Sequence, residues 1–259
     1  MKILTDAQWE TIKSILPIPP SPRRGRPRAN PREIFETILF VLMSGIPWGQ
    51  LPDGCPPKST VYDYFRFWSR TEGFKKLMKE IVGQLAQKGR IKSSLCFIDA
   101  MFVPAKRGGE GVGWTKRGKG VKVQVVVDQQ GLPVAVTVAS ANTGEPQMVQ
   151  GLLPFFPEEA QPEKIVGDKA YDADWLDEVL AQLGIEMIAP HRSNRLPQNK
   201  TQDGRKLKSY KKRWIVERTL SWLQNFRRVL VRYERSSLLY QSFVFLACLM
   251  ILLKRFPLL

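Results

Sequence analysis

Two acidic residues occupy positions where the sequence otherwise indicates a buried strand. Asp99 interrupts the apolar run LCFIDAMFV, and Asp168 follows the short apolar run in KIVGDKA. A charged side chain at such a position is costly unless a cation compensates it. A third acid, Glu217, lies in RWIVERTLSWLQNFRR, whose apolar residues line two faces of a helix. We therefore expect Glu217 to have limited access to bulk water.

Three such acids could perform metal-dependent chemistry if the fold brings them together. Carboxylates drawn together repel one another and raise each other's pKa, and divalent cations reverse that effect. Two hard cations about 4 Å apart can support in-line attack at a phosphodiester. The sequence offers no plausible His or Cys ligands, so it favours two Mg²⁺ or Mn²⁺ ions over Zn²⁺.

Each acid also has a simpler explanation. Asp99 could pair with a buried arginine, Asp168 could cap the turn after its strand, and Glu217 could bridge to Arg213 or Arg218. Other acids compete for the role, but turn and helix-cap positions already account for them. These competitors are Asp128, Asp172 and Asp174.

The charge balance indicates a polyanionic partner. Forty Lys and Arg face 24 Asp and Glu, which gives a net charge of +16. So one-sided a charge favours nucleic acid, and the alternatives are a ribosome-associated or a membrane-surface protein. The three cysteines and the single histidine show no disulfide or zinc spacing. The first residues lack the apolar region of a signal peptide, so we expect a cytoplasmic protein.

The elements that must position the acids divide into two regions. From Leu95 onward, strand patterns over 95–103, 121–127, 132–139, 164–168 and 185–189 alternate with helices after Glu145 and over 173–183. This order predicts an α/β domain with a mixed sheet, followed by a helix over 209–229. The apolar segment 238–253 is short for a membrane span, and we expect a buried C-terminal helix rather than a membrane anchor.

Residues 1–90 are predicted to be helical. Thr5 with Gln8 forms a capping box, Asn30-Pro31 begins a second helix that ends near Gly45, and a third begins near Ser59. Two helices of which the second carries Arg and aromatic residues are typical of a helix-turn-helix. DNA contact would then fall on Lys58, Tyr62 and Arg66. The connection between these helices is long for the tight form, and a helical bundle without DNA contact is the alternative.

Basic segments mark an expected DNA path. Residues 191–213 hold nine Lys or Arg and one acid, immediately before the Glu217 helix. A second run opens the predicted hairpin, where glycines allow backbone to approach phosphates. A third, RRGRPR, resembles an AT-hook, although a basic linker with non-specific phosphate contacts explains it equally well. The expected contacts are Lys116, Arg117 and Lys119 in the second run and Arg24, Arg26 and Arg28 in the third.

Long motifs in fixed order resemble a known family. The chain is similar to insertion-sequence transposases of the DDE class, in the four/five superfamily, over essentially its whole length. The N-terminal motifs are LTDAQWETIKSILP, GRPRANPREIFETILFVLMSGIPWGQLP and STVYDYFRFW. The remaining motifs are FIDAMFVPAK, TKRGKGVKVQVVVDQQGLPVAVTVASANTGE, VGDKAYDAD and YKKRWIVERTLSWLQNFRRVLVRYERS.

The resemblance implies a fold, an activity and roles for particular residues. It implies an RNase H-like core in which Asp99, Asp168 and Glu217 are catalytic and bind the metal ions, with Tyr210 and Arg213 positioning DNA near the cut. The protein would bind the terminal inverted repeats of its mobile element, cleave them and join them to target DNA. A homodimer is expected because two ends must be cut in concert. Rival functions are a repurposed transposase that only binds DNA and a nuclease without strand transfer.

The resemblance also fixes the expected domains and one departure. Residues 1–90 would be a helical DNA-binding domain, and residues 91–259 a catalytic domain with a basic insertion at about 190–212 and a C-terminal helix. The family often has Lys seven residues after the glutamate, where this chain has Gln224. On one continuous helix Arg228 would share a side with Glu217, so Arg228 is counted among the DNA contacts and could supply the missing charge.

Overall fold

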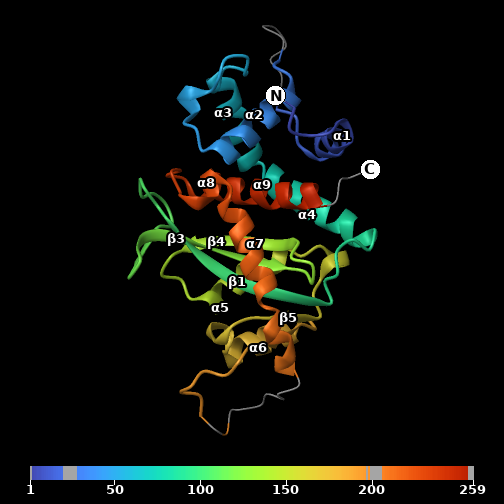
Figure 1. Ribbon diagram of the computed structural model, residues 1–259, viewed down its shortest axis with the longest axis vertical. Coiled ribbons are helices and arrows are strands. Elements are labelled where there is room, and N and C mark those ends of the chain that lie inside the picture. Colours follow the sequence, from blue (N-terminus) through green and yellow to red (C-terminus); the bar gives the residue numbers. More distant parts are fainter. Residues whose placement is uncertain (1, 20–27, 197, 199–205, 256–259) are drawn as a thin grey trace.

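The computed structural model describes residues 2–19, 28–196, 198 and 206–255. The N-terminal part is helical, and an α/β region with a long C-terminal helix follows it (Figure 1). The N-terminal helices are α1 (Asp6–Ile15), α2 (Pro31–Ser44), α3 (Lys58–Arg70) and α4 (Gly73–Gln87). The strands are β1 (Leu95–Pro104), β2 (Gly113–Thr115), β3 (Gly118–Val127), β4 (Pro133–Ser140), β5 (Lys164–Val166) and β6 (Glu186–Ile188). The later helices are α5 (Glu145–Leu152), α6 (Asp174–Ala181), α7 (Trp214–Gln224), α8 (Arg227–Leu230) and α9 (Ser237–Arg255).

The starts predicted for the first two helices are confirmed. Thr5 accepts a hydrogen bond from the N–H of Gln8, whose side chain returns one to the N–H of Thr5, so the capping box of α1 is complete. Asn30 caps α2 through the N–H of Arg32. The helix ends at Gly45, whose φ of 72° is in the left-handed region that glycine adopts most readily. Helix α4 was covered only by the general expectation of helix over residues 1–90.

The sheet is mixed, as the sequence predicted. Its order is β2-β3-β1-β5-β6, and β4 also pairs with β3. Strand β3 runs antiparallel to β1, β2 and β4, whereas β5 is parallel to both β1 and β6. The predicted hairpin is present as β3 and β4, joined by a turn in which Asp128 accepts hydrogen bonds from the N–H groups of Gln130 and Leu132. Asp128 therefore has the turn role expected of it.

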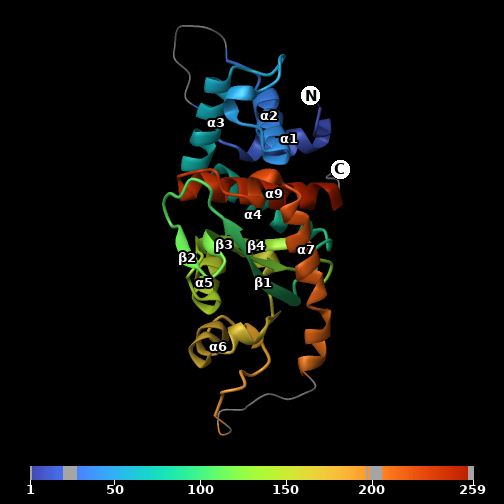
Figure 2. The same ribbon diagram turned by 60° about the vertical axis from the view of Figure 1, so that its left-hand side comes forward.

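Helix α9 joins the N-terminal helices to the sheet. It packs against α2, α3 and α4 on one side and against β4 on the other. Figures 1 and 2 both show it crossing between these layers. Its residues from Tyr240 to Leu253 are almost all buried, so the predicted buried C-terminal helix is confirmed. The segment Ser237–Lys254 is long and apolar enough for a membrane span by length and composition alone, and 72% of it is buried inside the fold.

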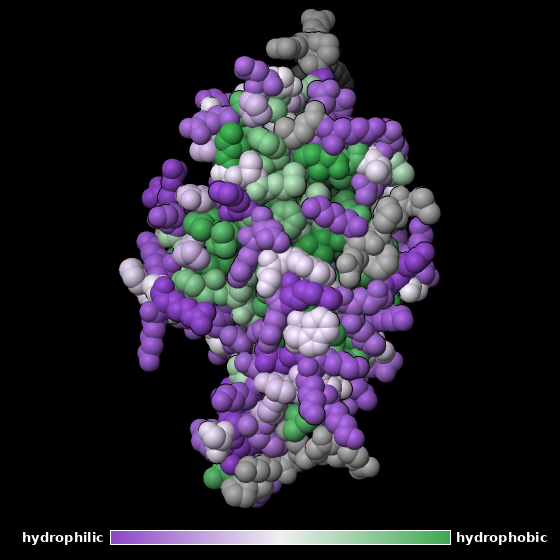
Figure 3. Space-filling view, viewed as in Figure 1, coloured by the Kyte–Doolittle hydropathy of each residue, from purple (hydrophilic) through white to green (hydrophobic). Residues whose placement is uncertain are grey.

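Helix α7 lies against β1 and β3 and runs down the molecule away from α9 (Figure 2). The prediction of one helix over 209–229 is wrong. Residues 206–212 form a 3-10 segment, α7 ends at Gln224, and α8 begins at Arg227 after an extended Phe226. Phe226 and Val229, on either side of the start of α8, are both buried. Around α7 the surface seen in Figure 3 is mainly hydrophilic, and apolar residues gather in the upper half of the molecule.

Candidate active site

Strand pairing places Asp99 and Asp168 just past the same end of the paired segment of β1 and β5. Phe97 on β1 is paired with Val166 on the parallel strand β5, and each acid follows its paired residue by two positions. Side chains two apart along a strand share a face, and neighbouring strands lie about 4.8 Å apart. The Oδ1 of Asp168 accepts a hydrogen bond from the N–H of Ala170 at 2.7 Å. The first two predicted acids therefore meet beyond the paired ends of these strands.

Asp99 is largely buried, with a side chain 18% exposed. Its Oδ1 accepts a hydrogen bond from the N–H of Ala100 at 2.8 Å. Burial raises the pKa of Asp99 above its ordinary value, and the carboxylates of Asp168 and Glu145 act in the same direction. The Ala100 N–H and the Arg213 guanidinium oppose this rise in pKa. The site is therefore one where negative charge needs a cation.

Arg213 provides that cation in the structure. Its Nη2 lies 3.0 Å from Asp99 Oδ2 and 3.9 Å from Glu217 Oε1, so one guanidinium connects two of the predicted acids. Its Nη1 donates to the hydroxyl of Tyr210 at 3.2 Å, and its guanidinium carbon lies 5.3 Å from the centre of the Tyr210 ring. Burial lowers the pKa of Arg213, but Asp99, Tyr210 and Asp168 outweigh this effect and raise it overall.

Glu217 is more accessible than the sequence predicted. Its side chain is 58% exposed, so the expectation of limited access to water is wrong. Helix α7 buries Ile215, Val216, Thr219, Leu220 and Leu223, while Glu217 lies on the remaining, open side. The apolar pattern was correctly identified, but the neighbouring elements cover only the part of the helix that faces β1 and β3. Glu217 can therefore change rotamer without displacing core residues.

Two residues that the sequence did not single out complete the site. Glu145, at the start of α5, is close enough to influence Asp99 and is paired with Lys122 at 3.3 Å. Tyr171 is fully buried and accepts a hydrogen bond from the Nε2 of Gln124 at 3.0 Å. Burial raises the pKa of Tyr171 well above its usual value, and Glu145 is the largest charged contributor to that rise. The only sequence signals were their positions in the ANTGE and GDKAYD motifs.

The donor set can be compared with what a divalent ion needs. In the part of the chain that the structure describes, no group of three His, Cys, Asp or Glu side chains is placed to hold one ion. Asp99 and Asp168 nevertheless supply hard oxygen donors in a half-buried, electronegative position. The residues thus fit a divalent ion by donor type and charge. Arg213 holds the Asp99 oxygen that such an ion would bind.

The predicted DNA contacts are spread over three places. Lys116, Arg117 and Lys119 are exposed around the turn from β2 to β3, beside Trp114, which is 74% exposed. Lys58, Tyr62 and Arg66 lie on α3. Arg28 is exposed at the approach to α2, whereas Arg24 and Arg26 lie outside the described residues.

Arg228 does not lie beside the acids. Because the helix breaks after Gln224, Arg228 points toward the N-terminal helices, where its Nη2 donates to the carbonyl of Ile46 at 2.6 Å. Its Nη1 donates to Glu234 at 2.9 Å. Gln224 itself donates to the sulfur of Met101. The expectation that Arg228 shares a helix side with Glu217 is therefore wrong.

Two family models cover most of the chain. Residues 4–78 match a family described as "Putative transposase of IS4/5 family", and residues 90–252 match one described as "Transposase DDE domain". The second match alone covers more than half of the 259 residues.

Individual relatives agree with these matches. A protein of Burkholderia cepacia described as "Putative transposase for insertion sequence element IS402" is 30% identical over 140 residues, which are 51% of this chain and 62% of that protein. A protein of Brucella ovis described as "Putative transposase for insertion sequence element IS6501" is 29% identical over 133 residues, which are 51% of this chain and 98% of that protein.

A solved structure identifies the fold class. The chain is similar to the piggyBac transposase in a cryo-EM structure of its synaptic complex with hairpin DNA, with a TM-score of 0.52 and 11% sequence identity. The match covers 88% of this chain and 66% of that one. The predicted RNase H-like α/β fold is thereby confirmed.

Proposed function

The chain belongs to the transposase DDE domain family, and from this membership we propose that it cuts DNA at the terminal inverted repeats of its own mobile element and joins the ends to target DNA. The observation that carries this proposal is the placement of Asp99 and Asp168 just past the paired ends of the parallel strands β1 and β5, with Glu217 linked to Asp99 through Arg213. Double-stranded DNA at both ends and at the target would be the substrate.

Each residue of the site has a distinct part in the proposed reaction. Asp99 and Asp168 would hold divalent metal, with Glu217 reaching in from the open side of α7, and two Mg²⁺ or Mn²⁺ ions are proposed. Bound metal lowers the pKa of an attacking water or hydroxyl and stabilises developing negative charge. The burial of Asp99 fixes its carboxylate, and the exposure of Glu217 lets it adjust. A water or a 3′-hydroxyl attacks the phosphorus of the phosphodiester, and the opposite 3′-oxygen leaves.

Arg213 has a second possible partner in this proposal. With Asp99 engaged in holding metal, the Arg213 guanidinium would be available to a DNA phosphate, the other common partner of a planar arginine fork. Tyr210 keeps the guanidinium in place through its hydroxyl and its ring. Arg213 would therefore bind the DNA backbone next to the cut.

The assembly is proposed on the same basis. Two ends cut in concert call for two active sites, so we propose a homodimer in the DNA complex. The proposed location is the cytoplasm. The exposed cations of the β2–β3 turn are proposed to contact DNA along with the N-terminal helices.

A cleavage assay on the element's own ends tests the proposal. Purified protein is given DNA that carries the terminal repeats, with Mg²⁺, and both cut and joined products are measured. Asp99→Asn should lower cleavage by at least a thousandfold, since an isosteric amide cannot supply the charge that the metal needs. The control is Asp53→Asn, an exposed aspartate before α3 that should leave cleavage unchanged.

Each other outcome has a defined meaning. Full cleavage by Asp99→Asn contradicts the assignment of the site. Tight DNA binding without cleavage by the wild type indicates a protein that only binds DNA, and cleavage without joining of pre-cut 3′-hydroxyl ends indicates a nuclease. Circular dichroism and thermal unfolding of each variant establish that a loss of activity is not a loss of fold.

A further inference from the structure

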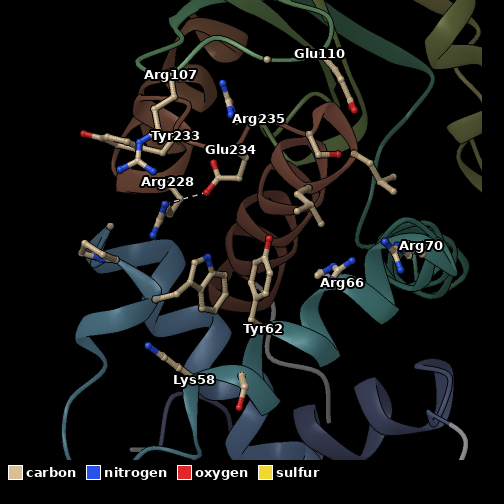
Figure 4. A pocket seen from close by; sticks show the side chains of 18 residues that line it. Lys58, Tyr62, Arg66, Arg70, Arg107, Glu110, Arg228, Tyr233, Glu234 and Arg235 are labelled. Carbon is tan, nitrogen blue, oxygen red and sulfur yellow. Dashed lines mark hydrogen bonds and ion pairs between the residues drawn. The ribbon is translucent and has the colours of Figure 1, made fainter.

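A large pocket lies apart from the acidic site, between the N-terminal helices and the C-terminal part of the chain. Its volume is about 1190 Å³. One wall is the exposed side of α3, and the opposite wall consists of the 107–110 segment and the connection from α8 to α9, residues 233–236 (Figure 4). The two walls come from regions about 40 or more residues apart in the sequence. Neither wall contains a residue of the acidic site.

Both walls carry cations that face the hollow. Lys58, Arg66 and Arg70 project from α3, and Arg107 and Arg235 stand opposite (Figure 4). Of these five, only Arg66 pairs with an acid among the described residues, and it meets Asp63 at the long distance of 4.0 Å. Unpaired cations that face each other across a hollow repel, so this arrangement favours an anion between them.

The two acids in the lining do not neutralise these cations. Glu234 is engaged by Arg228 at 2.9 Å, and the side chains of both are buried, with exposures of 7% and 6%. Glu110 keeps its negative charge, because the Ser237 N–H that donates to it at 3.2 Å is neutral, but this single carboxylate faces five cations. The charge presented to the hollow therefore remains positive.

The wall opposite α3 is held rigidly. The N–H of Glu110 donates to the carbonyl of Arg235 at 2.8 Å, and Arg232 donates to the carbonyls of Glu110 and Arg235. Gly109, with φ of 116°, lies so close to Arg235 that an added Cβ would overlap its backbone. Arg107 and Arg235 are thus placed by fixed backbone before any ligand arrives, which reduces the ordering cost of binding.

Aromatic rings accompany the cations on both walls. Tyr62 lies 5.8 Å from the guanidinium of Arg66, and Tyr233, 38% exposed, lies 5.8 Å from that of Arg228. Grooves that bind nucleic acid combine cations that track the backbone with aromatic faces that contact sugars or bases. A purely anionic small molecule would not require two such faces.

We propose that this pocket binds the phosphodiester backbone of a DNA strand, held between α3 and the pair Arg107 and Arg235. The inference rests on the proposed function, because it specifies where the transposase holds DNA away from the cut. It also gives α3 a different role from a protruding recognition helix, since its basic side chains form one wall of a hollow. Contacts of this kind position DNA and do not depend on sequence.

The salt dependence of DNA binding tests the proposal. Two pair variants each remove two cations from one wall: Arg66→Gln with Arg70→Gln, and Arg107→Gln with Arg235→Gln. The logarithm of the binding constant falls linearly with the logarithm of the salt concentration. Each lost phosphate contact makes this slope shallower by about 0.9 on duplex DNA and about 0.7 on a single strand. A fourfold rise in salt weakens duplex binding by the wild type and by each pair variant. The factor by which it weakens binding should be roughly twelvefold smaller for each pair variant than for the wild type.

A matched control and a second ligand sharpen the test. Lys76→Gln with Lys88→Gln removes the same charge from exposed positions on and after α4, away from the pocket, and should keep the wild-type slope. Duplex and single-stranded oligonucleotides of equal length are compared. The form of DNA for which the pair variants change the salt slope more is the form whose backbone the pocket binds. Thermal unfolding confirms that the exposed substitutions leave the fold intact.

The outcomes separate this proposal from the function on which it rests. A loss of slope in both pair variants but not in the control supports the pocket. A wild-type salt slope in either pair variant overturns the proposed role of the pocket. The proposed transposase function is unaffected by that result if cleavage of the element ends still depends on Asp99. A wild-type protein that binds neither oligonucleotide, and cleaves no DNA, overturns both.

Discussion

Two arginine–carboxylate pairs in this molecule have similar geometry and different settings. Arg213 meets Asp99 at 3.0 Å, with side chains 14% and 18% exposed. Arg228 meets Glu234 at 2.9 Å, with side chains 6% and 7% exposed. The first pair lies among further acids, and the second lies beneath a pocket rich in cations.

The difference indicates which pair can exchange its partner. Near Asp99, burial and neighbouring carboxylates leave a demand for positive charge that a metal ion could meet instead of Arg213. Arg228 has no such freedom, because it also donates to the carbonyl of Ile46 and so joins the C-terminal segment to the N-terminal helices. We call Arg213 and Asp99 the open pair, because its setting suits chemistry. We call Arg228 and Glu234 the closed pair, because it holds the fold together although its distance is similar.

The largest expected effect is on stability, at the closed pair. Glu234→Gln keeps the shape but leaves the charge of Arg228 buried without a counter-charge, and we expect a loss of roughly 3–5 kcal/mol in the free energy of unfolding. The matched change at the open pair, Asp99→Asn, should cost far less, since Arg213 keeps Asp168 and Glu217 nearby. Urea unfolding of both variants measures the difference.

A double substitution checks the reason for that loss. Arg228→Met combined with Glu234→Leu removes both charges, and it should recover much of the stability that Glu234→Gln loses, because no unpaired charge remains. Equal losses for Glu234→Gln and Asp99→Asn would contradict the distinction between a closed and an open pair.

A smaller effect is expected on metal affinity at the open pair. If a divalent ion competes with Arg213 for Asp99, Arg213→Met should tighten Mn²⁺ binding by about tenfold, which is roughly 1.4 kcal/mol. Mn²⁺ binding is measured by titration calorimetry without DNA. Lys212→Met, an exposed change of the same charge in the preceding residue, is the control and should have a weaker effect. Unchanged affinity in Arg213→Met would show that the guanidinium does not compete with metal.

Local sequence signals predicted the positions of most elements. The capping box at Thr5, the Asn30-Pro31 start and the glycine at position 45 are decided by a few adjacent residues, and each was confirmed. Asp99 and Asp168 were also singled out, because a charged side chain in or after an apolar strand needs a partner; Asp99 pairs with Arg213 and Asp168 caps the turn after its strand, as the simpler explanations predicted. Their placement just past the same end of two neighbouring strands follows from the parallel pairing of β1 with β5.

Features that depend on tertiary contacts were not predictable. The break between Gln224 and Arg227 interrupts a pattern of apolar residues that would fit one continuous helix, because Phe226 is extended, and no local sequence signal marks it. That one break moved Arg228 from the acids to the N-terminal helices. The proximity of Glu145 and Tyr171 to Asp99 likewise arises from the packing of separate segments, with no local pattern to indicate it.

The smallest expected effect is the pH dependence of stability that Asp99 contributes in metal-free protein. Burial raises the pKa of Asp99 in the folded state, so the folded protein binds this proton more tightly than the unfolded chain does. The associated stability is complete below the unfolded pKa of about 3.9 and is lost as the pH rises through the folded pKa.

The variant Asp99→Asn lacks this loss, so its stability relative to the wild type should increase over that pH range. Urea midpoints measured in EDTA across the acid range test this expectation. The effect is small because Arg213 and the Ala100 N–H already oppose the shift, and a relative stability that decreased with pH would mean that the pairing with Arg213 outweighs burial.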